Sequence, residues 1–118
     1  MLDFTITGQP IGYKRTTQRG KFCDEDYHRY QAYKFHVVNC FLEQCTGDWG
    51  HPKPLTTTKG QKTRVDIMIY FNSKGMRHGD PSNVYKGIED ALFTVDKYIC
   101  GSFDFQYDSN PRVEITIS

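Results

Sequence analysis

The sequence contains no apolar run that approaches the ~20 residues needed to cross a bilayer. It also lacks a basic N-terminal segment followed by an apolar stretch, so we expect neither a membrane partner nor a secretory signal. Its 118 residues are enough for one domain with a hydrophobic core. The hydrophobic fraction of 37% and the aromatic fraction of 14% are typical of a globular chain rather than a disordered one.

The sequence also lacks a cysteine motif for metal binding or redox chemistry. The four cysteines form no CxxC pair, and no histidine stands beside them in a ligand-like spacing; they are Cys23, Cys40, Cys45 and Cys100. We therefore expect free, mostly buried thiols in a reducing compartment, which without an export signal means the cytoplasm. The chain has no phosphate-binding Gly-rich motif, no GxSxG and no dinucleotide fingerprint.

Positive charge is distributed unevenly although the net charge is only +1. Most basic residues lie in three segments without acids, 10–23, 49–65 and 67–79. Segregated positive charge on a near-neutral chain favours a local site for a polyanion. The alternative, ordinary lysine-rich surface loops, is equally compatible with charge alone.

Apolar periodicity predicts the element order β-α-β-α-β-β. Alternating residues predict strands at 2–7, 63–71, 101–107 and 112–118, and helical spacing predicts helices at 24–45 and 80–93. Each strand has one apolar face. The prediction is an α/β (α+β) fold with a single four-stranded mixed sheet and two helices on one face. The other sheet face would be acidic and would not contact phosphate; it carries Asp3, Asp66, Asp104 and Glu114.

The segment from Asp80 to Asp96 holds the residues most capable of chemistry. Asp80 stands at the start of the second predicted helix, Lys86 lies within it, and Asp96 follows it. Two carboxylates that approach each other require a cation, and Mg²⁺ prefers carboxylate and phosphate oxygens. A nearby lysine would offset charge on a phosphate. From spacing alone, a plain helix N-cap at Asp80 and solvated side chains at Lys86 and Asp96 remain the alternatives.

The same segment resembles the signature of RusA-type Holliday-junction resolvases, which are common in phages and prophages. The matching residues are Asp80, Asn83, Lys86, Asp90-Ala91-Leu92 and Asp96. The opening Phe4-x-Ile6-x-Gly8-x-Pro10, followed by Lys14-Arg15, is similar to the start of that family. The resemblance covers most of the chain, but its specific part is about twenty residues.

The resemblance implies one RusA-like endonuclease domain over 1–118. It implies a homodimer that binds four-way DNA junctions and resolves them by paired nicks with Mg²⁺ in DNA recombination and repair. Asp80 and Asp96 would be metal ligands and Lys86 an essential cation, while Asn83 would brace the start of the helix and Asp90 would have a structural role. The expected DNA-binding residues are Lys14, Arg15, Arg19, Lys21, Lys59, Lys62 and Arg77.

One residue departs from the family pattern. The second acidic ligand of the family falls at Ser82, and a hydroxyl is a poorer Mg²⁺ ligand than a carboxylate. Either Asp66, Glu89 or Asp90 substitutes for it, or a water does, or the site is weakened. A weakened site would leave a module that binds branched DNA without cutting it. A third reading is a small interaction domain that binds no nucleic acid.

Two aromatic residues beside basic segments, Tyr13 and Trp49, could stack on exposed bases, although packing within the protein accounts for them equally well. The histidines at 28, 36 and 78 complete no recognisable metal site. We therefore assign them no function.

Overall fold

The computed structural model describes residues 2–13, 25–45, 62–72, 80–93 and 98–118. These residues form the predicted order of elements. The elements are β1 (Leu2–Thr7), α2 (Glu25–Gln44), β2 (Thr63–Phe71), α3 (Pro81–Leu92), β3 (Ile99–Tyr107) and β4 (Arg112–Ile117). The four strands make one mixed sheet, which confirms the predicted α+β fold.

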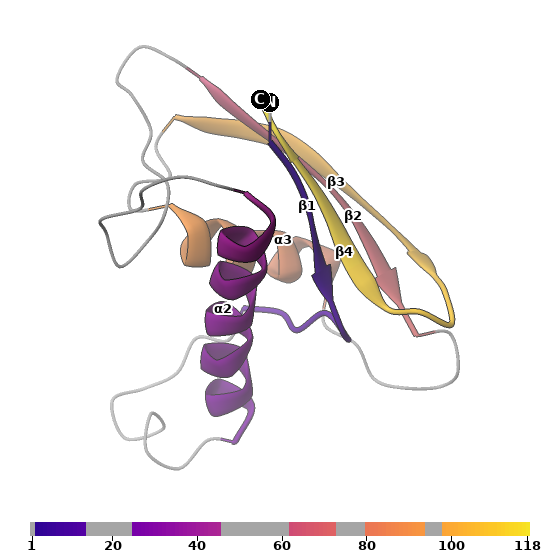
Figure 1. Ribbon diagram of the computed structural model, residues 1–118. Helices are drawn as coiled ribbons and strands as arrows, with labels where there is room; N and C mark the ends of the chain where they lie inside the picture. The colour runs from indigo at the N-terminus through magenta and orange to yellow at the C-terminus, as the bar shows by residue number, and fades with distance from the viewer. Residues whose placement is uncertain (1, 14–24, 46–61, 73–79, 94–97) are drawn as a thin grey trace.

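The sheet order is β1-β4-β2-β3. Strand β4 is antiparallel to both of its neighbours, whereas β2 and β3 are parallel. Parallel pairing requires a crossover, and α3 provides it between β2 and β3. The strands at the two edges of the sheet are therefore β1 and β3 (Figure 1).

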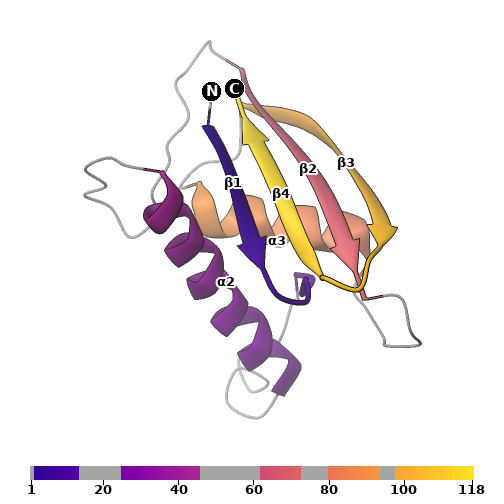
Figure 2. The same ribbon diagram turned by 45° about the vertical axis from the view of Figure 1, so that its right-hand side comes forward.

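Both helices lie against the same face of the sheet, with α2 toward β1 and α3 crossing the strands (Figure 2). The covered face carries the alternating apolar residues of β1, β2 and β4, which are buried except for the half-buried Leu2. Phe4 of β1 meets Phe41 of α2 edge to face, with ring centroids 5.2 Å apart. Burial of this apolar surface is the main driving force for the fold.

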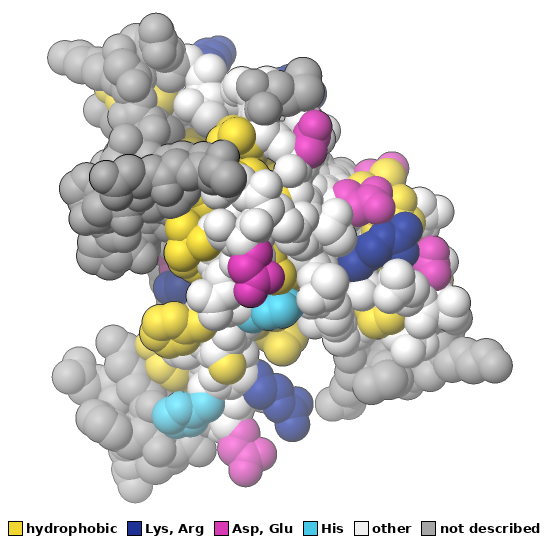
Figure 3. All heavy atoms as spheres, in the orientation of Figure 1, with side chains coloured by type: hydrophobic (Ala, Val, Ile, Leu, Met, Phe, Trp, Pro, Cys, Tyr) yellow, Lys and Arg dark blue, Asp and Glu magenta, His cyan; other side chains and the backbone are white. Residues whose placement is uncertain are grey.

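The uncovered face of the sheet is less acidic than the strand pattern predicts. All four predicted acids do lie on it, Asp3, Asp66, Asp104 and Glu114, but so do two arginines. Arg64 Nε is 2.7 Å from Asp66 Oδ2, and Arg112 Nε is 3.1 Å from Glu114 Oε2. Side chains of both signs are therefore interspersed over the strands at the right of Figure 3. This mixture gives phosphate no strongly positive surface to bind.

Strand β3 differs from the expectation of a buried apolar face. Its aromatic residues are in register with the buried residues of β2, yet they remain exposed: Phe103 by 43%, Phe105 by 44% and Tyr107 by 52%. The cause is position, because β3 is an edge strand that α2 does not reach. Periodicity shows which way a side chain points and not whether a helix covers it.

The described cysteines are free thiols, as predicted, with Cys40 and Cys45 buried and Cys100 half-buried. Cys23 lies outside the described residues. Among the described helices, none combines the length and the apolar character that crossing a membrane requires.

Candidate functional site at the start of α3

Asp80 is the N-cap of α3. Its Oδ1 accepts hydrogen bonds from the Ser82 amide at 2.9 Å and from the Ser82 hydroxyl at 2.7 Å. Its main-chain oxygen accepts from the amides of Asn83 and Val84. Pro81 follows in the first turn, where its missing amide hydrogen costs nothing. The capping interpretation of Asp80 is therefore confirmed.

Capping leaves part of the Asp80 carboxylate available. Only Oδ1 takes part in the cap, and Oδ2 has no hydrogen-bond partner among the described residues. The hydroxyl of Ser82, and then its amide, hold the pKa of Asp80 below its ordinary value. The exposed carboxylate is thus ionised near neutral pH and can offer one oxygen to a cation.

Ser82 does not supply the missing second acid. Its hydroxyl donates to Asp80, so it stabilises the carboxylate that a metal would share. The remaining lone pairs of a neutral hydroxyl are weak ligands for Mg²⁺. Capping therefore explains why serine suits this position without any metal.

The three acids considered as substitutes for that ligand do not reach Asp80. Asp66 lies on the uncovered sheet face, where it binds Arg64 and the amide and hydroxyl of Ser102. Glu89 and Asp90 lie about 13–15 Å further along α3, at about 1.5 Å per residue. At these positions none of the three acids lies beside Asp80 within the same chain.

Asp90 instead joins the two helices. Its Oδ2 accepts from Lys34 Nζ at 2.7 Å and from the Tyr30 hydroxyl at 3.1 Å. Burial, and then the charge of Asp90, raise the pKa of Tyr30 above its ordinary value, so the phenol stays protonated and donates. These contacts support the expected structural role of Asp90. The sequence pattern does not single out Lys34, because nothing in it shows which residue of α2 faces Asp90.

Lys86 is exposed and lies beside Tyr13, with Nζ 4.6 Å from the ring centroid. The Tyr13 amide donates to the Asn83 main-chain oxygen at 2.9 Å, and the Tyr13 ring meets Tyr30 edge to face. Tyr13 therefore packs within the protein, which is the second of the two alternatives predicted for it. Asn83 does brace the start of α3, but through main-chain atoms that any residue would provide.

Gly87 allows this close packing. A Cβ at Gly87 would lie 3.0 Å from Tyr30 Cε1 and 3.4 Å from the Tyr13 amide nitrogen. The segment that precedes the basic residues 14–21 is thereby held against α3, on the face that carries Lys86.

Asp96 lies outside the described residues, so its approach to Asp80 remains a prediction. The length of α3 nevertheless limits how closely Asp96 can approach Asp80. From Asp80 to Phe93 the helix axis rises about 20 Å, while the link 94–96 spans at most about 11 Å when extended. The two carboxylates can meet within one chain only if that link runs straight back along α3.

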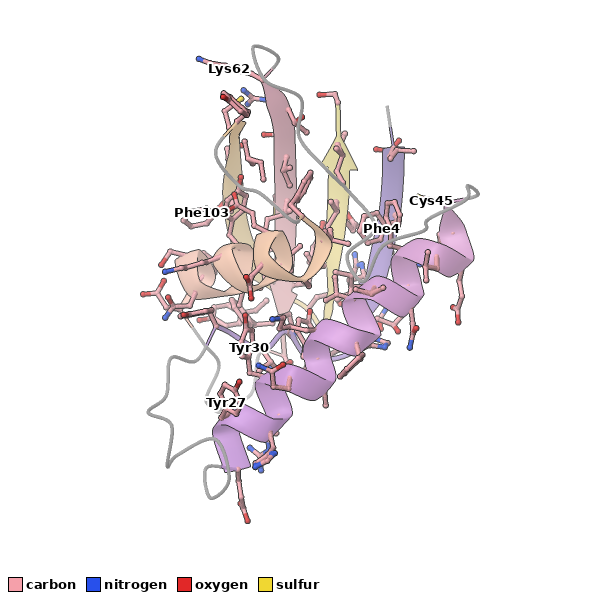
Figure 4. All side chains as sticks on the ribbon, turned by 90° about the vertical axis from the view of Figure 1, so that its left-hand side faces the viewer. Phe4, Tyr27, Tyr30, Cys45, Lys62 and Phe103 are labelled. Atoms are coloured by element: carbon pink, nitrogen blue, oxygen red, sulfur yellow. The ribbon has the colours of Figure 1, made fainter. Side chains whose placement is uncertain are left out.

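Most of the predicted DNA-binding residues also lie outside the described residues: Lys14, Arg15, Arg19, Lys21, Lys59 and Arg77. Trp49 and His78 are outside them as well. Lys62 is described, and it is exposed just before β2, at the end of the sheet away from α3 in Figure 4.

The described residues do not by themselves make a Mg²⁺ site. Within 2–13, 25–45, 62–72, 80–93 and 98–118, no three His, Cys, Asp or Glu side chains gather as a metal site requires. At the start of α3, the carboxylate oxygen that the described helix cap does not use is Oδ2 of Asp80. A site of the expected kind therefore depends on Asp96.

None of the protein-family models matches the chain, and no curated protein sequence matches it.

Proposed function

We propose that this protein is a Mg²⁺-dependent, structure-specific DNA endonuclease that acts on four-way junctions. The observation that carries the proposal is the ionised Asp80 carboxylate, exposed at the start of α3 with Oδ2 unused among the described residues, on the helix that also holds Lys86. The resemblance to RusA-type resolvases rests on the same residues. A bound Mg²⁺ supplies activation of a water and stabilisation of the departing oxygen of a phosphodiester.

Within this proposal Asp80 and Asp96 hold the metal, and Lys86 offsets the charge that builds up on the phosphate. Tyr13 positions Lys86, since its ring lies under the ammonium group. The DNA arms bind the basic residues of 14–21, 53–64 and 74–77 within a homodimer. Contacts of this kind make the affinity for DNA fall steeply as salt rises.

The decisive experiment incubates the purified protein with a four-way junction, with Mg²⁺ or with EDTA. Wild type is expected to nick the junction only with Mg²⁺, and Asp80→Asn, Lys86→Gln and Asp96→Asn are expected to lose cleavage. Glu43→Gln is a matched control, because Glu43 is an exposed acid on α2 outside the proposed site. Cleavage that survives Asp80→Asn would leave the activity intact and the assigned site wrong.

A second candidate is a module that binds branched DNA without cleaving it. Two observations favour it: Ser82 replaces an acid, and neither Asp66, Glu89 nor Asp90 replaces that acid in space. Binding to the junction without nicks, at any Mg²⁺ concentration, would establish this candidate. No binding even at low salt would leave the third reading, an interaction domain in which Asp80 is only a cap.

A further inference from the structure

Aromatic side chains of β3 lie exposed beside α3, on the helix side of the sheet. Phe103 and Phe105 are in register with the buried Ile67 and Ile69 of β2, yet they are 43% and 44% exposed. The Phe103 ring lies 5.6 Å from the Tyr85 ring of α3, with 38° between the ring planes. Figure 4 shows Phe103 at the outer edge of the sheet, next to α3. We call Tyr85, Phe103 and Phe105 the β3 platform.

Contacts within the protein hold the β3 platform in place. The Tyr85 hydroxyl donates to the Val65 main-chain oxygen at 3.3 Å, which ties that ring to β2. The Phe105 ring meets the buried Phe71 ring edge to face, with centroids 6.1 Å apart. Asp104 lies between the two phenylalanines in the strand and therefore projects from the opposite face of the sheet. The rings are thus supported on one side and open to a flat ligand on the other.

The β3 platform adjoins the candidate site at the start of α3. Tyr85 contacts β2 and β3, whereas Asp90 in the last turn contacts α2, so the helix starts on the β3 side (Figure 2). Ser82, which donates to Asp80, lies one turn before Tyr85 on the same face of the helix. The helix axis rises about 7–8 Å from Asp80 to Tyr85. A stacked strand, at ~3.4 Å per nucleotide, covers this distance in two or three nucleotides.

We propose that the β3 platform binds unpaired bases of a DNA strand whose phosphate lies at Asp80. The inference rests on the proposed function, because it takes DNA as the substrate, and it adds the group that is recognised, the flat face of a nucleobase. Aromatic rings stack on every kind of base, since each base has a π face. A base that is already unpaired costs least to bring onto a ring, whereas a base inside a duplex must first be unstacked. The platform therefore gives the site a preference for branched DNA over a continuous duplex.

Charge does not account for binding at this surface. Lys86 follows Tyr85 in the chain, but Glu89 lies one turn beyond Tyr85. Burial, and then a hydrogen bond with Glu89, raise the pKa of Tyr85. The surface around the rings thus carries both signs of charge, and the contribution of the platform to affinity comes from stacking. Two oligonucleotides with the same number of phosphates isolate this contribution.

The test compares an oligothymidine with an oligomer of equal length whose central residues are abasic. Fluorescence anisotropy measures the binding of each at low salt in EDTA, where no cleavage occurs. Wild type is expected to bind the oligothymidine about tenfold more tightly or better. Phe103→Leu and Phe105→Leu are each expected to weaken oligothymidine binding about fivefold. Neither variant should alter binding of the abasic oligomer.

Two variants serve as controls. Phe103→Tyr keeps an aromatic ring and is expected to keep the preference for oligothymidine. Phe35→Leu alters a residue that is 72% exposed on α2, away from the platform, and is expected to bind both oligomers as wild type does. Circular dichroism confirms that each variant is folded, and Phe105→Leu decides the question if Phe103→Leu does not fold.

The platform is overturned by a wild type that binds both oligomers equally or binds neither. It is also overturned if Phe103→Leu and Phe105→Leu bind DNA as wild type does, and a changed mass of these variants in sedimentation would then assign the rings to a protein contact. The two proposals fail separately. A protein that prefers oligothymidine but never nicks a junction keeps the platform and loses the endonuclease, and one that nicks without this preference does the reverse.

Discussion

Lys34 Nζ lies 2.7 Å from Asp90 Oδ2 and joins the middle of α2 to the last turn of α3. The Tyr30 hydroxyl donates to the same oxygen, so one carboxylate links the two helices where they cross. The crossing in turn holds Tyr13 against the face of α3 that carries Lys86. Asp90 is one of the residues that resemble the RusA-type signature. It supports the arrangement of Tyr13 and Lys86 through the packing of the two helices.

Asp90→Asn is expected to lower the free energy of unfolding by about 1 kcal/mol, a value discounted because the Asp90 side chain is 42% exposed. Lys34 would lose its ionic partner and Tyr30 its charged acceptor. Urea unfolding measures the change. Lys34→Met combined with Asp90→Asn completes a double-mutant cycle. An Asp90→Asn protein of unchanged stability that no longer cuts DNA would give Asp90 a chemical role instead.

Gly87→Ala is expected to destabilise the protein by about 1–3 kcal/mol, although alanine favours helix by about 1 kcal/mol over glycine. The new methyl group would lie 3.0 Å from Tyr30 Cε1, and that ring is held by Asp90 and Tyr13. Thermal unfolding checks the sign. Tyr30→Leu should remove much of the effect of Gly87→Ala. A stabilised Gly87→Ala protein would show that the tyrosine ring moves freely.

Asp80→Asn should separate capping from charge, because asparagine caps helices as well as aspartate does. The pKa of folded Asp80 lies below its unfolded value near 3.9. Its charge therefore stabilises the fold above about pH 4, and this contribution is lost as the pH falls through the folded pKa. Between pH 7 and pH 3 the urea midpoint of Asp80→Asn should fall less than that of wild type. Equal falls would mean that Ser82 does not lower the pKa of Asp80.

Ser82→Asp tests whether the site is a weakened metal centre. The second carboxylate would stand near Asp80 and add a charged ligand, so Mg²⁺ should bind about 10-fold more tightly or better. Calorimetric titration with Mg²⁺ measures binding, and junction cleavage measures its consequence. Ser109→Asp is a matched control, because it adds the same charge at an exposed serine outside the proposed site. Unchanged Mg²⁺ affinity would show that Asp80 belongs to a helix cap alone.

The alternation of apolar residues in strands and their helical spacing in helices were sufficient to predict the order of the elements and most of their bounds. Leu2, Phe4 and Ile6 alternate with polar residues, and such a pattern can bury only one face. The cap at Asp80 was also predictable, since Asp-Pro before an amphipathic segment is a local signal whose partners lie within three residues.

The contacts of Asp66 and Asp90 were not predictable from local sequence. Both are acids within predicted elements, yet one binds Arg64 and Ser102 on the uncovered face and the other binds Lys34 between the helices. Ser102 is 36 positions from Asp66, and Lys34 is 56 positions from Asp90. The packing of the elements brings these residues together, and a local sequence pattern does not predict it.

The sequence by itself determined which residues form strands and helices and which face of each is apolar, because both properties depend on neighbours within a few positions. Only the tertiary structure decided that β3 lies at an edge, that its aromatic residues stay exposed, and that neither Asp66 nor Asp90 can join Asp80. Strand order and helix crossing are set by the burial of the whole apolar surface at once, which no local stretch of residues encodes.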